Sequence, residues 1–166
     1  MFTQSESFKI VPIIEAYLPQ VLVVYKQCED FLSLGPIPKA SMDMVKADFD
    51  HSKEENGLFC GIYDLEENMI GIVDFVPNMF EGNPEQAFIF LIMIARPYRN
   101  KGLGRKVIEA VENKIKEDPQ VRVVLSAVQT NNERAIKFWE NLGFDIIGDP
   151  EPRPDKTVVY QLRKNL

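Results

Sequence analysis

Apolar and polar positions follow a helical period in the first part of the chain. Between residues 18 and 31 the apolar side chains recur every three or four positions, which predicts a helix beginning near Leu18 with Pro19 in its first turn. The segment LGPIPK at 34–39 ends this helix, because glycine and proline interrupt helical hydrogen bonding. Ser41 is expected to cap a second helix. The apolar side of that second helix carries Met42, Val45 and Phe49.

Other segments follow the pattern of strands. Residues 8–13 predict a short first strand, and residues 58–64 and 69–76 predict a hairpin around the polar turn EEN. The run AFIFLIMIA at 87–95 is apolar at every position, which is typical of a central strand covered on both faces. A run of this length is too short to span a bilayer as a helix.

Helix and strand alternate in the second half of the chain. The apolar spacing predicts a helix from Leu103 and another between an asparagine cap, Asn131 or Asn132, and a glycine stop at Gly143. The remaining strands are expected at 121–128, 144–148 and 157–163, the last two as an antiparallel pair. This order predicts a single α+β domain over residues 1–166.

Composition narrows the class of protein. The chain has 166 residues, 45% of them hydrophobic, which is enough for one domain with a real core. Its formal net charge of −6 argues against nucleic acid and membrane surfaces as partners, since both are polyanions. Cys28 and Cys60 have no CxxC spacing and give no metal motif. The N-terminus has no signal-peptide pattern, so a cytoplasmic location is expected.

A strongly basic loop stands out against this acidic background. RPYRNKGLGRK at 96–106 holds five basic side chains and two glycines between the buried strand and the helix. The next strand follows that helix, so the unit is βαβ with parallel strands, and the loop lies at a helix N-terminus that favours an anion. Gly102 and Gly104 let the backbone approach it closely. Charge is added by Arg99, Lys101, Arg105 and Lys106. A solvated basic turn is the alternative.

The common nucleotide motifs do not fit this loop. A phosphate-binding GxxxxGK[ST] sequence is absent, and the third glycine of a dinucleotide GxGxxG motif is replaced by Val107. The following strand also lacks a terminal acidic residue and offers Ser126 instead. A plain nucleotide-binding protein is therefore disfavoured.

Two segments resemble the GNAT superfamily of N-acetyltransferases. Residues 99–104 match its [Q/R]xxGx[G/A] signature, and NNERAIKFWENLGF at 131–144 is similar to its N-x-x-A-x-x-aromatic-Tyr-x-x-x-G-F segment. The order of elements fits the same fold over nearly the whole chain. The resemblance implies a mixed, mostly antiparallel central sheet with one parallel βαβ pair splayed apart, and helices on both faces.

The resemblance also implies that the splayed strands hold acetyl-CoA as co-substrate. The loop amides would bind its pyrophosphate, and backbone groups near Met93 and Ile94 would bind the pantetheine and the thioester carbonyl. Ile94 would stabilise the developing oxyanion through its backbone. Asn132 would reach the cofactor, cap its helix, or do both. The full cofactor set is Met93, Ile94, Arg99, Asn100, Lys101, Gly102, Leu103, Gly104, Arg105, Asn132, Phe138 and Trp139.

The acid and the base are not assigned by the motifs. Many members of the superfamily have a tyrosine where this chain has Trp139, and an indole N–H is not a usable acid. Trp139 is therefore expected to pack beside the cofactor sulfur. Asp74 lies in the apolar run GIVDFV, either buried with partners or facing the cleft, and is a candidate base or water-positioning group. His51 is expected at the surface.

The predicted function is transfer of an acetyl group from acetyl-CoA to a primary amine by direct attack on the thioester. The alternative is a non-catalytic acyl-CoA-binding or regulatory module. The acceptor, a small molecule or a peptide or protein amine, is expected to bind between the first two helices and the loops 77–84 and 149–156. Acidic residues in these segments are Asp43, Asp48, Asp50, Glu81, Asp149 and Glu151. No metal is expected, and the protein is expected to be a monomer or a homodimer.

Overall fold

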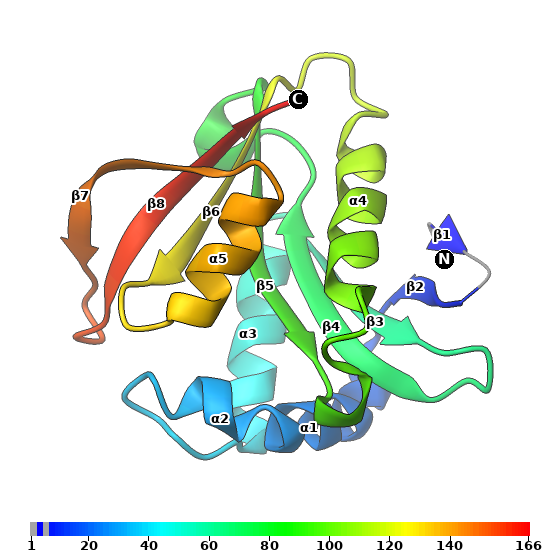
Figure 1. The fold of residues 1–166 in the computed structure, drawn as a ribbon. Helices are drawn as coiled ribbons and strands as arrows, with labels where there is room; N and C mark the ends of the chain where they lie inside the picture. The colour runs from blue at the N-terminus through cyan, green and yellow to red at the C-terminus, as the bar shows by residue number, and fades with distance from the viewer. Residues whose placement is uncertain (1–2, 5–6) are drawn as a thin grey trace.

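A mixed sheet forms the centre of the computed structural model, which describes residues 3, 4 and 7–166 (Figure 1). Residues 1, 2, 5 and 6 of the predicted domain lie outside the described part. Within the described residues the sheet has eight strands, in the order β1-β2-β3-β4-β5-β6-β8-β7. Their bounds are Thr3–Gln4, Lys9–Pro12, Leu58–Tyr63, Met69–Val76, Gln86–Ile94, Val123–Gln129, Asp145–Pro152 and Val158–Asn165 for β1 to β8. β5 and β6 run parallel, and the other neighbouring pairs are antiparallel.

Helices cover both faces of the sheet, as predicted. α1 (Leu18–Gln27) and α3 (Met42–Glu54) lie behind it in Figure 1, while α4 (Leu103–Ile115) and α5 (Glu133–Asn141) lie in front. Ser41 caps α3 by accepting a hydrogen bond from the amide of Met44. No helix in the described part of the chain is long and apolar enough to cross a membrane.

The first helix is interrupted where the sequence predicted continuous helical spacing. α1 ends at Gln27, Cys28 has φ −109° and ψ 18°, and a separate short helix α2 (Glu29–Leu32) follows. The amide of Cys28 donates to the carbonyl of Tyr25, which tightens the last turn and closes α1. α2 lies near the carboxyl end of β5 (Figure 1), and its Asp30 side chain contacts Arg99 of the loop that follows this strand.

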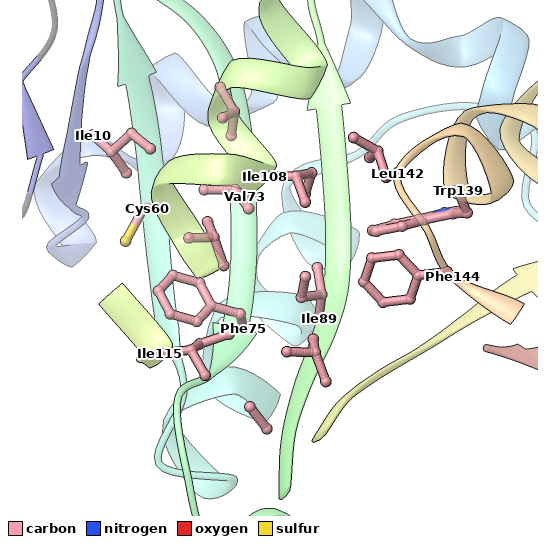
Figure 2. Close-up of a cluster of buried hydrophobic side chains, with 14 of the residues drawn as sticks. Ile10, Cys60, Val73, Phe75, Ile89, Ile108, Ile115, Trp139, Leu142 and Phe144 are labelled. Atoms are coloured by element: carbon pink, nitrogen blue, oxygen red, sulfur yellow. The ribbon is translucent and has the colours of Figure 1, made fainter. Parts of the chain in front are cut away.

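Two apolar layers hold the helices on the sheet. One lies under α4 and α5 and includes Ile108, Ile115, Trp139 and Phe144 (Figure 2). The other lies under α1 and α3 and is formed by Ile13, Leu18, Val21, Val24, Tyr25, Cys28, Val45, Phe49, Phe59, Ile72 and Met93. β4 and β5 contribute to both layers, which explains why their sequences are apolar at nearly every position.

The parallel pair separates before its strands end. β5 and β6 pair from Gln86–Val123 to Ile89–Ser126, and beyond that register the two strands diverge toward their carboxyl ends (Figure 1). On its other edge, β5 carries a bulge, since Phe75 pairs with Ile89 and the preceding residue of β4 pairs with Leu91. A bulge bends the strand that contains it, so the extra residue accompanies the opening of the sheet. The predicted splay is thereby observed.

Candidate active site

The opening between β5 and β6 leads into a cleft of about 1560 Å³. Residues on the α4 and α5 side of the sheet line one part of the cleft, including Leu103, Gly104 and Phe138. Residues of α3 and of the loop between β4 and β5 line the other part, including His51 and Phe80. A molecule in this cleft can therefore reach both faces of the sheet through the gap.

The basic loop has the predicted position between a buried strand and a helix. Asn100 and Gly102 have left-handed backbones, with φ of 61° and 76°, and Gly102 is the N-cap of α4. The first intrahelical hydrogen bond runs from the amide of Lys106 to the carbonyl of Gly102. The amides of Leu103, Gly104 and Arg105 precede that bond and have no helical acceptor, so they present donors at the positive end of the helix dipole.

Arg99 anchors this loop through its side chain. Its Nε donates to the carbonyl of Ile94 at 2.7 Å, and Nη1 and Nη2 donate to the two Asp30 carboxylate oxygens at 2.6 and 3.1 Å. The side chain is only 16% exposed. The hydrogen bond from Arg99 lowers the pKa of Asp30 and keeps the pair charged. The charge that Arg99 brings to the loop is therefore paired with Asp30 of α2, and a role of Arg99 in binding a cofactor stays a prediction.

Other cations remain beside the loop. Lys101 lies over the Tyr98 ring, with Nζ 6.0 Å from the centroid, and Arg105 donates to the carbonyl of Asn141 at 2.8 Å. Arg134, in the first turn of α5, donates to the Asn100 side chain and lines the cleft. Arg134 was missed in the sequence, although it stands within the second family-like segment. It links the two segments across the mouth of the cleft.

Gly104 permits close packing of two helices. A Cβ atom at this position would lie 3.1 Å from Cε2 of Phe138, closer than most real contacts. The absence of a side chain at residue 104 therefore favours the close approach of the α4 N-terminus to α5. This packing requirement adds to the predicted need for close approach of an anion.

The β5 backbone presents hydrogen-bonding groups to the gap. The amide of Ala95 donates to Ile70 of β4, and the carbonyl oxygen of Met93 lies against Gly71 of β4. Backbone groups of successive residues in a strand point to opposite edges, so those of Ile92 and Ile94 face the gap. The carbonyl of Ile94 is already bonded to Arg99. The amide of Ile94 is thus directed toward the cleft, whereas Met93 lines the cleft with its backbone turned to β4.

α5 supplies the opposite wall of the cleft on the α4 side of the sheet. Asn132 caps the helix, accepting from the amide of Ala135 at 3.0 Å, and also lines the cleft. Trp139 is 5% exposed and packs edge-on against Phe144, with ring centroids 4.9 Å apart, and lies beside it in Figure 2. Phe138 contacts the Trp139 ring at 5.3 Å. The geometry of Trp139 is that of a packing residue at the edge of the cleft.

Asp74 lies on the other face of the sheet, beneath α3. Its Oδ1 accepts a hydrogen bond of 2.6 Å from the Ser52 hydroxyl, and the residue is 3% exposed. The pKa of Asp74 is raised to about 6: burial raises it most, the Ser52 hydrogen bond lowers it, and the charge of Asp48 raises it. Burial also raises the pKa of Asp48, whose Oδ2 accepts from the Tyr25 hydroxyl at 2.8 Å. Of the two positions the sequence allowed, buried with partners or facing the cleft, the structure has the first.

The α3 side of the cleft, where the sequence predicts the acceptor, includes residues from the predicted segments. It is lined by Phe31 near the first helices, by Glu81 in the loop between β4 and β5, and by Glu151. The predicted loop 149–156 is shorter than expected, because β7 extends to Pro152 and Glu151 pairs with Val159 of β8. Of the acidic residues named above, Glu81 and Glu151 line the cleft; Glu55 and Asp155 do so as well and were not anticipated. His51 is exposed, as expected, but it also lines the cleft, with its ring 5.1 Å from that of Phe90.

The family model for the acetyltransferase (GNAT) family matches residues 23–144. The chain belongs to the acetyltransferase (GNAT) family.

Known proteins support this assignment. A probable N-acetyltransferase, san, from Drosophila melanogaster is 30% identical over 87 residues, which are 51% of this chain and 47% of that relative. The chain thus matches about half the length of this relative. An acetyltransferase from Thermus thermophilus shares the fold with a TM-score of 0.80 at 18% identity, over 96% and 97% of the two chains. Spermidine N-acetyltransferase from Vibrio cholerae, solved with CoA and spermine, has a TM-score of 0.71 at 16% identity, over 97% and 96%.

Proposed function

We propose that the protein is an N-acetyltransferase that moves an acetyl group from acetyl-CoA to a primary amine. One observation carries this proposal: the β5–β6 ladder stops at Ile89–Ser126, and the resulting cleft extends from the basic loop on one face of the sheet to the α3 side on the other. Such a passage lets a long cofactor enter from one face and an acceptor meet its end from the other. Family membership supports the same reaction.

The basic loop would hold the diphosphate of the cofactor. The amides of Leu103, Gly104 and Arg105 have no helical acceptor and would face the diphosphate at the N-terminus of α4. Such amides bind anions even where no charged side chain takes part. Arg134 adds charge in the lining of the cleft and Lys101 adds charge over Tyr98, whereas Arg99 fixes the loop to β5 and α2. The pantetheine arm would then follow β5 into the gap.

The chemistry at the thioester depends mainly on position. A neutral amine attacks the carbonyl carbon, a C–N bond forms, and negative charge develops on the carbonyl oxygen. We assign the stabilisation of that charge to the amide of Ile94, which faces the gap. The C–S bond then breaks and the thiolate of CoA leaves. With a reference thiol pKa of about 8.5, the thiolate does not need an acid at the position of Trp139.

The proton lost from the amine needs an acceptor in the cleft. Asp74 is bonded to Ser52 under α3 and is not among the residues that line the cleft, so direct contact with the amine is not part of the proposal. Its role would be limited to positioning α3. His51 and the carboxylates of Glu55 and Glu81 line the acceptor part and can pass a proton to water.

A non-catalytic acyl-CoA-binding module is the second candidate, and Trp139 in place of tyrosine is the feature that favours it. Incubation with acetyl-CoA and a mixed panel of amines, with detection of free thiol over time, separates the two. Amine-dependent thiol release supports the enzyme. Tight binding of acetyl-CoA without release of free thiol for any amine supports the module.

We place the protein in the reducing cytoplasm, consistent with two buried free thiols, Cys28 and Cys60.

A further inference from the structure

The acceptor part of the cleft has a continuous aromatic wall, formed by His51, Phe80, Phe88 and Phe90. Phe80 and Phe88 are stacked at 4.4 Å with 26° between their planes, and Phe88 and Phe90 are tilted at 4.9 Å. The His51 ring closes the row against Phe90 at 5.1 Å. All four residues line the cleft. The wall comes from three separate segments, α3, the 77–84 loop and β5, which the fold brings together.

The wall lies on the acceptor face and not on the cofactor face. Ala87 and Ile89 belong to the core layer under α4 and α5, so the alternating residues Phe88 and Phe90 point to the α3 side. The contact between Phe90 and His51 of α3 confirms this side. The wall therefore begins beside the point where the β5–β6 ladder ends, where an acceptor amine would have to stand.

The loop that carries Phe80 is held in an unfavourable backbone conformation. Met79 and Glu81 have φ of 58° and 51°, and Gly82 has φ of 78°. Left-handed backbone is costly for residues with a side chain and persists where packing imposes it, often at ligand sites. Here it places Phe80 flat on Phe88 at the end of the wall. Met79 beside it is 54% exposed and makes no comparable stack.

Carboxylates flank the aromatic wall. Glu55 and Glu81 line the cleft from the same elements that carry the wall, while Glu151 and Asp155 line it from the β7–β8 side with Arg153. Negative charge is thus in excess in the acceptor part. It suits a ligand with one positive charge and a large apolar group. A polyamine would need carboxylates along its whole length, whereas here they stand at the edges of an apolar surface.

We infer that the preferred acceptor is a primary amine joined by a short linker to an aromatic or similarly large apolar group. This inference rests on the proposed function. The ring of the acceptor would pack against Phe80 and Phe90, the half-buried phenylalanines of the wall, and its ammonium end would point to the gap. A free arylalkylamine and an N-terminal aromatic residue of a peptide share this chemistry.

Binding and turnover are tested separately. Phenethylamine, n-propylamine and spermidine are titrated calorimetrically into the protein saturated with CoA, which needs no catalysis. We expect phenethylamine to bind at least about tenfold more tightly than n-propylamine, because the ring is buried on the wall. It should also bind more tightly than spermidine. Equal affinity of phenethylamine and n-propylamine, or tighter binding of spermidine, overturns the inference.

The same pairs are then compared as substrates with acetyl-CoA, together with the tripeptides Phe-Gly-Gly and Gly-Gly-Gly. A higher kcat/KM for the aromatic member of either pair supports the inference and identifies the source of the amine. Turnover of spermidine ahead of both aromatic amines overturns it and leaves the proposed acetyltransferase intact. Selective binding of phenethylamine without turnover of any amine supports the aromatic site and overturns the proposed function.

Variants locate the effect on the wall. Phe80→Ala should weaken phenethylamine binding by about tenfold and change n-propylamine binding by less than about twofold. Phe80→Leu, which keeps an apolar side chain, should lie between the two. Leu65→Ala is the matched control, because Leu65 is an apolar residue 66% exposed in the β3–β4 turn and does not line the cleft. Equal losses for both amines in Phe80→Ala would contradict the proposed stacking.

Discussion

The buried carboxyl of Asp74 makes a testable contribution to stability, and the variant Asp74→Asn isolates it. Burial raises the pKa of Asp74 from 3.8 to about 6 in the folded protein. The folded state therefore binds a proton more readily than the unfolded chain. The stability that protonated Asp74 contributes to the folded protein is present at low pH and is lost as the pH rises from about 4 to about 6. Above this range, ionised Asp74 costs about 3 kcal/mol relative to a protonated group.

The stability of Asp74→Asn is compared with that of the parent protein at two pH values. Differences between the Asp and Asn side chains that do not depend on pH then cancel. Asparagine can still accept from the Ser52 hydroxyl but does not ionise. The stability of Asp74→Asn relative to the parent protein should increase by about 2 kcal/mol between about pH 4.5 and about pH 7.5. This corresponds to about 4–8 °C in melting temperature for a domain of this size. Urea unfolding at both pH values measures the free energy directly.

Two controls define the result. Glu54→Gln changes an exposed carboxyl on α3 and should show a much smaller dependence on pH. Ser52→Ala removes the hydrogen bond that lowers the pKa of Asp74, so it should destabilise the protein more at neutral than at acidic pH. A pH-independent difference between Asp74→Asn and the parent protein would refute the assigned pKa. In the transfer assay, kcat should stay within about threefold, whereas loss of a direct base typically costs a hundredfold or more.

Further predictions concern the cofactor side of the cleft. Gly104→Val should weaken acetyl-CoA binding by at least about tenfold in calorimetry, because a side chain there meets Phe138; unchanged affinity would contradict this. Trp139→Phe should retain most of kcat, and a hundredfold loss with intact cofactor binding would show that the indole N–H takes part. Trp139→Ala should lower the unfolding free energy by about 3–5 kcal/mol in urea. Asp30→Asn should weaken acetyl-CoA binding by releasing Arg99 from α2, and equal affinity would show that this pair does not order the loop.

Local pattern was sufficient to predict much of this fold. The apolar periods of α3, α4 and α5 and the uniformly apolar β5 reflect burial on one face of each helix and on both faces of the strand. The glycines of the basic loop and the cap at Asn132 are also local features, and the structure has both where they were predicted. Helix starts at Ser41 and near Leu18 follow from capping and proline placement.

The remaining features depend on contacts between distant segments. The break at Cys28 has no glycine or proline to mark it, and the partners of Arg99 and Arg134 lie 69 and 34 residues away. A basic side chain in a glycine-rich loop looks the same in sequence whether it binds an anion or an aspartate. The aromatic wall is hidden for the same reason: Phe88 and Phe90 stand in a run where every residue is apolar.

One extra residue in β5 links the two halves of the proposed site. The bulge near Phe90 lies just past the last β5–β6 pair, so pairing on one edge is disturbed where pairing on the other edge ends. On the cofactor side this leaves the backbone of Ile92 and Ile94 facing the gap. On the acceptor side the Phe90 ring stands between His51 and Phe88. The groups that would hold the thioester and the acceptor are therefore set by the same short stretch of strand. Their relative position is fixed by the backbone of β5, which is consistent with catalysis that relies on positioning more than on an acidic side chain at residue 139.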